Sequence, residues 1–168
     1  VGAEDVWFRL RGRERAHRGL EVGHEQCGRQ PLAHDVRDRQ TGRTLLASSN
    51  SAGQAANADV EVGDNFNPYI DISGNGRYVV FVSTATNLVA ADGNGVKADV
   101  FRKDLTTGQV VVVSLSSSGA AADQSVLGDP SISYDGTRVA FTTGTAKNLF
   151  VGDNSIDSDV VLRDVSAG

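Results

Sequence analysis

The stretches DISGNGRYVVFVS (71–83) and SISYDGTRVAFTT (131–143) share one pattern. In each, a short run ending in Ile-Ser precedes a turn pair, Asn75-Gly76 or Asp135-Gly136, and a run rich in Val, Phe, Tyr or Thr follows it. Asn-Gly and Asp-Gly are strong signals for the tight turn of a β-hairpin because both positions tolerate positive φ. Each stretch is therefore predicted to form two antiparallel strands joined by a turn.

The similarity continues along the chain at one offset of 60 residues, which aligns Phe81 with Phe141. A partial third copy lies upstream at an offset of 66, where Asp38 aligns with Asp104. Internal repetition of this kind indicates an architecture assembled from stacked copies of one unit. Further matches at the first offset are Asp99-Val100 with Asp159-Val160, Asp104 with Asp164, Gly108 with Gly168 and, with one residue of slippage, Asn87-Leu88 with Asn148-Leu149.

Four antiparallel strands are expected in each copy, and no stretch has a convincing helical period. Four such strands describe a propeller blade. The predicted fold class is therefore all-β, with tandem four-stranded antiparallel blades of a partial β-propeller, and a β-sandwich of hairpins is the alternative. The expected strands are 70–72, 77–83, 99–105 and 109–115 in the first copy, 131–133, 137–143 and 159–165 in the second, and 43–49 as the upstream counterpart of 109–115.

The repeat pattern divides the chain into a repetitive part, 36–168, and a segment that does not fit, 1–35. That segment holds all three His, the only Cys and the only Trp. Two interpretations stay open: an irregular N-terminal arm, or a segment read out of frame until about Val36. Either way it is expected to add no blade of its own. Within 36–168, the expected units are a partial blade at 36–53, a blade at 68–116 and an incomplete blade at 129–168.

The quoted hairpins continue into TNLVAADGNGVKADVFRKDLTTG (86–108) and KNLFVGDNSIDSDVVLRDVSAG (147–168). Together these stretches resemble the TolB-like, or PD40 (WD40-like), β-propeller family over about residues 36–168. The resemblance implies an interaction platform or a companion to a catalytic domain, in bacterial and often secreted proteins. It therefore implies a secreted or periplasmic location, with a protein, peptide or glycan as partner. No basic stretch followed by an apolar one opens the sequence, so no signal peptide is expected in it.

The charge of the chain is acidic, with a net formal charge of −5. Nucleic acid is excluded as a partner because phosphate binding needs clusters of Lys and Arg. A membrane span is not expected, since no apolar run reaches the ~18 residues that a spanning helix needs. With Cys27 as the only cysteine, no disulfide within the chain is possible.

Two loops are rich in oxygen-bearing side chains. Ca²⁺ takes about six to eight oxygen ligands, so these loops are candidate calcium sites. The spacing is not that of an EF-hand, because Val96 occupies the fifth loop position and no Glu closes the loop. The alternative is that these side chains form Asx-turns that bracket the hairpins. The residues are Asp92, Asn94 and Asp99 in the first loop, and Asp153, Asn154, Asp157 and Asp159 in the second.

No strong catalytic signature is present, so a binding scaffold is the first interpretation. A Ser-His-Asp triad is excluded in the repeats because no His follows His34. The group His17, His24 and Cys27 matches no zinc template. The alternative function is a carbohydrate-active hydrolase or lyase that uses paired carboxylates, with candidates Asp71, Asp92, Asp135 and Asp153, each of which also fits a solvated surface position.

The linker between copies carries two aromatic residues, Phe66 and Tyr69, that either stack on a ligand or fill the core. The expected blade at 129–168 lacks an outer strand, and an open edge is a template for pairing with another chain. We therefore expect a homo-oligomer, or a fragment of a longer propeller. In the expected oligomer, strand 43–49 of one molecule completes the blade at 129–168 of the next.

Overall fold

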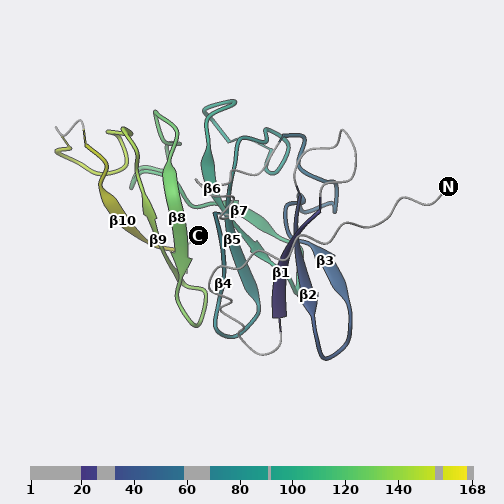
Figure 1. The fold of residues 1–168 in the computed structure, drawn as a ribbon. Coiled ribbons are helices and arrows are strands. Elements are labelled where there is room, and N and C mark those ends of the chain that lie inside the picture. The colour runs from purple at the N-terminus through teal and green to yellow at the C-terminus, as the bar shows by residue number, and fades with distance from the viewer. Residues whose placement is uncertain (1–19, 26–32, 59–68, 91, 154–156, 166–168) are drawn as a thin grey trace.

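The structure, a computed structural model, describes residues 20–25, 33–58, 69–90, 92–153 and 157–165 (Figure 1). Ten strands in these ranges form three antiparallel sheets, and no helix occurs among them. In every sheet, each strand pairs with its neighbours in the sequence. The prediction of an all-β fold with antiparallel sheets is confirmed.

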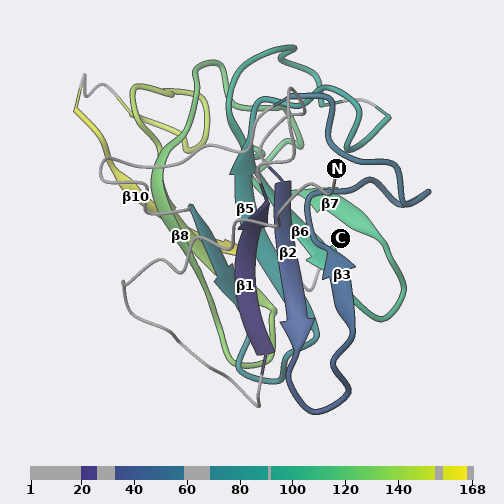
Figure 2. The same ribbon diagram turned by 45° about the vertical axis from the view of Figure 1, so that its right-hand side comes forward.

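The three sheets follow one another along the chain and stand side by side, with the second between the first and the third (Figures 1 and 2). The first contains β1 (Leu20–Glu25), β2 (Ala33–Asp38) and β3 (Thr44–Leu46). The second contains β4 (Ile70–Ile72), β5 (Tyr78–Ser83), β6 (Asp99–Asp104) and β7 (Val110–Val112). The third contains β8 (Leu127–Ile132), β9 (Arg138–Thr142) and β10 (Val160–Asp164).

The second sheet has the four strands expected between residues 68 and 116, in the order β4-β5-β6-β7. The Asn75-Gly76 turn sets its first hairpin, with Gly76 at a φ of 73°. Phe81 of β5 lies opposite Phe101 of β6, and their rings stack with centroids 5.9 Å apart. The Asn-Gly turn and the run of Val and Phe residues therefore give this sheet the pairing that the sequence predicted.

Both faces of the second sheet are buried, because successive side chains of a strand point to opposite faces. Val79, Phe81 and Phe101 belong to a cluster with Val36 and Ala47 of the first-sheet region. On the other face, a second cluster joins Val80, Val82 and Val100 to Val139, Phe141 and Leu149 of the third-sheet region. The sheets therefore stack through two separate apolar cores, one on each side of the second sheet.

The first sheet differs from what the sequence suggested. β1 and the start of β2 lie inside 1–35, the segment expected to be irregular, and β3 pairs with β2 of the same chain. Residues 44–46 are therefore the edge strand of the first sheet, paired on one side with β2 of the same chain. Completion of another molecule's blade by this strand stays a prediction. The 66-residue repeat extends to this sheet in its hydrogen bonds, including those of Ser48 and Asp38, whose counterparts are Ser114 and Asp104.

Those hydrogen bonds recur atom for atom. The N–H of His34 donates to Oγ of Ser48 (2.9 Å), and the N–H of Val100 donates to Oγ of Ser114 (3.1 Å). The carbonyl of His34 accepts from Ala47 as that of Val100 accepts from Val113. His34 stands where the second sheet has Val, so alignment of residue types could not detect the equivalence.

Candidate functional site

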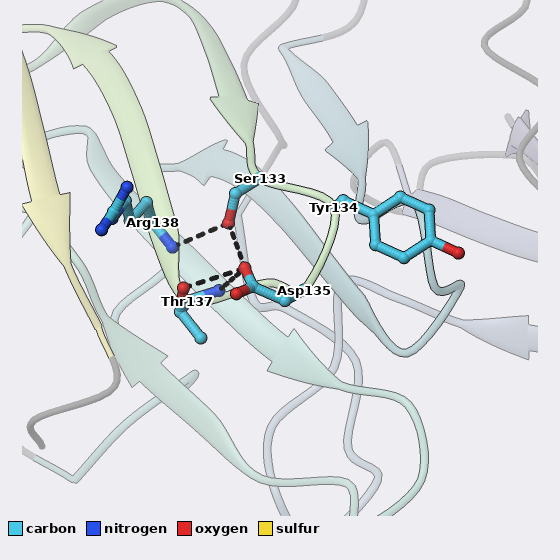
Figure 3. A pocket seen from close by; sticks show the side chains of 5 residues that line it. All are labelled: Ser133, Tyr134, Asp135, Thr137 and Arg138. Carbon is cyan, nitrogen blue, oxygen red and sulfur yellow. Dashed lines mark hydrogen bonds between the residues drawn. The ribbon is translucent and has the colours of Figure 1, made fainter.

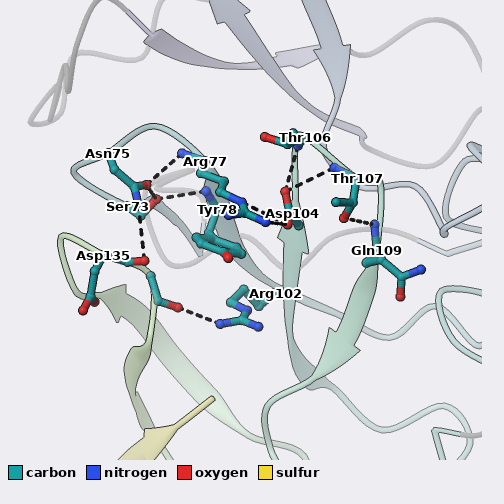
Figure 4. A network of polar contacts seen from close by, with 11 residues as sticks. Ser73, Asn75, Arg77, Tyr78, Arg102, Asp104, Thr106, Thr107, Gln109 and Asp135 are labelled. Carbon is teal, nitrogen blue, oxygen red and sulfur yellow. Dashed lines mark hydrogen bonds and ion pairs between the residues drawn. The ribbon is translucent and has the colours of Figure 1, made fainter. Parts of the chain in front are cut away.

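The Asn75-Gly76 and Asp135-Gly136 turns lie side by side at one end of the second and third sheets (Figure 4). The N–H of Asn75 donates to the carbonyl of Tyr134 (2.9 Å), and Nη1 of Arg102 donates to the carbonyl of Gly136 (2.7 Å). The two turns are thus joined directly, and Arg102 on β6 reaches across to the third sheet.

Each turn is braced by its own side chains in the same way. Oδ1 of Asn75 accepts from Oγ of Ser73 (2.7 Å), and Oδ1 of Asp135 accepts from Oγ of Ser133 (2.6 Å). The N–H of Arg77 donates to Asn75, as that of Thr137 donates to Asp135. These contacts explain why the sequence repeats a Ser followed two residues later by Asn or Asp.

A cationic and aromatic group adjoins the turns. Two guanidinium groups lie over the ring of Tyr78. That of Arg102 is 4.6 Å from the ring centroid, and that of Arg77 is 5.0 Å from it. Nη2 of Arg77 also forms an ion pair with Oδ2 of Asp104 at 2.7 Å. Burial would raise the pKa of Asp104, but hydrogen bonds from Arg77 and from two turn amides lower it to about 2. Asp104 is therefore ionised at neutral pH.

An open pocket of ≈ 340 Å³ lies at the Asp135-Gly136 turn, with the exposed ring of Tyr134 at its edge (Figure 3). Hydrogen bonds from Ser133 and Thr137 lower the pKa of Asp135 to about 2. This carboxylate is thus ionised at neutral pH and cannot act as a general acid there. The pocket is lined by Ser133, Tyr134, Asp135, Thr137 and Arg138.

The other Asp residues considered for hydrolysis have structural contacts. Oδ2 of Asp71 accepts from the N–H of Ile132 (3.0 Å) and from Oγ of Ser131 (3.3 Å), which ties the second sheet to the third. Oδ1 of Asp92 accepts from the amides of Asn94 and Gly95, which is an Asx-turn. Asp153 is half-buried in the loop before β10.

The first candidate calcium loop brings two of its residues together. Asp99 is 1% exposed; its Oδ1 accepts from Oγ of Ser114 (2.5 Å), while its Oδ2 is buried without a hydrogen-bond partner. Nδ2 of Asn94 donates to the carbonyl of Ala122 (3.0 Å), and its Oδ1 is likewise buried without a partner. Burial raises the pKa of Asp99, whereas hydrogen bonding with Ser114 and Asn94 lowers it.

In the second loop, Oδ2 of Asp159 is also buried without a partner, and Asp157 is exposed. Asn154 and Phe66 lie outside the described residues. Tyr69 packs against the core between the second and third sheets, which supports the core-filling interpretation of this residue. In the part of the chain that the structure describes, no three His, Cys, Asp or Glu side chains gather to hold a metal ion.

Among the three residues compared with zinc templates, His24 lies on β1 opposite His34. His17 and Cys27 fall outside the described residues. His34 is buried and its ring meets that of Phe81 edge-on, with centroids 6.3 Å apart. The alignment of sequences did not anticipate this position, because it is apolar in the second sheet.

A repeated Asn contact is the strongest feature that the sequence showed without explaining. Nδ2 of Asn87 donates to the carbonyl of Ala55 (2.8 Å), and its Oδ1 accepts from the N–H of Asn57 (3.0 Å). Nδ2 of Asn148 donates to the carbonyl of Ala121 (2.7 Å), and its Oδ1 accepts from the N–H of Asp123 (3.0 Å). Each Asn ties its own repeat to the segment that follows the previous sheet.

A cationic side chain makes a second repeated contact between neighbouring sheets. Nζ of Lys103 donates to the carbonyls of Leu46 (3.3 Å) and Ser49 (2.9 Å). At the equivalent position of the third sheet, Nη1 of Arg163 donates to the carbonyls of Leu115 (3.0 Å) and Ser116 (3.1 Å).

Comparison with known proteins finds a similarity in fold to a solved structure and none in sequence family. No protein-family model matches the chain, and no curated protein matches it. Among solved structures, the crystal structure of the tricorn protease is similar, with a TM-score of 0.51 and 14% sequence identity. The match covers 89% of this chain and 11% of that chain, and the tricorn protease contains β-propeller domains. None of the described elements is a helix long and apolar enough to cross a membrane.

Proposed function

We propose that the three sheets are consecutive blades of a β-propeller of the TolB-like (PD40) kind, and that the chain is a binding scaffold. The observation that carries this proposal is the repeated contact between sheets: Asn87 and Lys103 bind the first sheet's segment as Asn148 and Arg163 bind the second's. A sandwich has one interface between two sheets. Here one interface geometry occurs twice in the same sense, as radial repetition requires.

Binding is favoured over hydrolysis because the candidate carboxylates have structural contacts. Asp71 joins two sheets and Asp135 braces a turn. The partner is a protein, peptide or glycan, and the location is secreted or periplasmic, as the family resemblance implies. The exposed ring of Tyr134 beside Arg138 and Asp135 offers an apolar face and both charges to such a partner.

The third sheet supplies the surface at which further assembly occurs. Its face directed away from the second sheet, the open face, carries Val160 (78% exposed), Leu162 (67% exposed) and their neighbour Ala140. In the second sheet, Val100 and Arg102 occupy the positions of Val160 and Leu162. Val100 is buried against the third sheet, and Arg102 binds it. The open face is therefore built to receive another blade.

In a solution of the pure chain, only a second copy provides such a blade, so the proposal predicts self-association. Sedimentation velocity at tens of micromolar is the test. Leu162→Asp places a charge on the open face and should yield monomers. Val151→Asp, at a loop position 95% exposed, is the matched control and should sediment as the unmodified protein does. An unmodified protein that remains monomeric would refute the assembly.

A further inference from the structure

The loop before β6 ends at a buried carboxylate, Asp99, one oxygen of which has no hydrogen-bond donor. Oδ2 of Asp99 is buried without a hydrogen-bond partner, although Oδ1 of the same carboxylate binds Ser114. A buried carboxylate oxygen that loses its hydration without gaining a partner is costly, and such groups are usually explained by an ion, a water or a proton. A cation, a water molecule or a proton is therefore expected next to the second carboxylate oxygen of Asp99.

A second buried oxygen without a hydrogen-bond donor lies in the same loop. Oδ1 of Asn94 is also buried without a partner. The side chain of Asn94 is near enough to Asp99 for its amide group to lower the pKa of that carboxyl. Asp92 is close enough for its negative charge to act on Asp99 as well. Three oxygen-bearing side chains thus gather within eight residues.

The same feature occurs again in the next repeat. Asp159, which is 60 residues after Asp99, also leaves Oδ2 buried without a hydrogen-bond partner. The two loops differ in sequence between these positions, with Asp92 and Asn94 in one and Asp153 and Asp157 in the other. Recurrence at equivalent residues of two loops with different sequences argues against a chance packing defect.

We propose that the loop 92–99 binds a divalent cation of the calcium class through Asp92, Asn94 and Asp99. Every candidate ligand is a carboxylate or amide oxygen, which suits a hard cation and not zinc. Ca²⁺ fits better than Mg²⁺ because it accepts irregular sets of about six to eight oxygens, including backbone carbonyls and water. The inference is independent of the propeller assembly.

The expected effect of Ca²⁺ is to fasten the loop to its own sheet. Asp99 binds Ser114, which follows β7, and Asn94 binds the carbonyl of Ala122 in the segment that follows. A cation held by Asn94 and Asp99 would therefore link the loop before β6 to the chain after β7. Ca²⁺ should raise the melting temperature of the protein.

Isothermal titration of the full chain with CaCl₂ after EDTA treatment, together with thermal unfolding, tests the proposal. We expect saturable binding with one ion per chain at this loop, and a rise in Tm of about 5–10 °C at 100 times the dissociation constant. Asp99→Asn should weaken binding at this loop at least tenfold. Asp38→Asn, at the end of β2 in the first sheet, should leave binding unchanged.

Asp92→Asn provides the second variant in case Asp99→Asn does not fold, because Asp92 is only half-buried and Asn retains the turn-capping oxygen. It should also weaken binding. Absence of saturable Ca²⁺ binding to the unmodified protein would overturn the proposal. So would equal binding of Mg²⁺, or affinities unchanged in every folded Asp92 and Asp99 variant.

Discussion

The ring of Tyr78 covers Gly136 in the next sheet so closely that a Cβ added to this glycine would lie 2.1 Å from Cδ2 of the ring. The relation is reciprocal, since a Cβ at Gly74 would lie 2.1 Å from Cδ2 of Tyr134. Each turn thus places an aromatic ring where the other has no side chain. This exchange lets the two sheets approach at their ends.

Gly136→Ala should destabilise the protein by about 3 kcal/mol, because the methyl group meets Tyr78 and the residue has a φ of 77°. Gly119→Ala is the matched control, with a φ of 82° and nothing within 4 Å of the added Cβ. It should cost about 1 kcal/mol from backbone strain alone. Urea unfolding measures both, and equal losses would contradict a close contact with Tyr78.

Asn87→Ala and Asn148→Ala should each destabilise the protein by about 2 kcal/mol, because each removes two hydrogen bonds between neighbouring repeats. The two losses should be similar, since the contacts are equivalent. Gln109→Ala, at an exposed position, should change the free energy of unfolding by less than about 0.5 kcal/mol. A neutral effect of either Asn substitution would show that the contact does not join the sheets.

Lys103→Met should destabilise the protein by about 2–3 kcal/mol, because it leaves the carbonyl of Ser49 without the ammonium donor. Lys103→Arg should lose much less, since Arg163 makes the equivalent contact between the second and third sheets. Chemical denaturation of the two variants tests the equivalence. The reverse order of stability would show that the two cations have different roles.

Acid should remove part of the stability through Asp104, whose pKa falls from its ordinary value of 3.8 to about 2 in the folded protein. A carboxyl with a lowered pKa stabilises the fold above its unfolded value, and this contribution disappears as the pH falls from about 4 to 2. Its size is about 1–2 kcal/mol after allowance for solvent screening. Asp104→Asn should flatten the stability profile over that interval, whereas an unchanged slope would argue against the Arg77 pair.

The second sheet could be predicted because its first turn has a local sequence signal. The pair Asn75-Gly76 favours a hairpin turn whatever residues lie elsewhere in the chain. β2 was missed because His34 takes a position beside Val36 on its buried face, where an apolar residue would have made the alternation visible, and its pairing with β1 uses backbone atoms. The contacts of Asn87 and Lys103 could not be predicted from the sequence either. Their acceptors are backbone carbonyls, which every residue has, so no residue type identifies them. Candidate ligands such as Asp99 could be found, but not the burial of one carboxylate oxygen.

The second sheet has an apolar residue at each position from Val79 to Val82, so neither of its faces is marked as the inside. A slip of one residue would exchange one apolar face for the other at little hydrophobic cost, and the turn carries most of the register information. During synthesis at about 5–20 residues per second, the ~60 residues of the next repeat need about 3–12 s to follow. For that interval Val80 and Val100 stand uncovered on the nascent chain, where premature pairing with a neighbouring ribosome's product competes with correct folding.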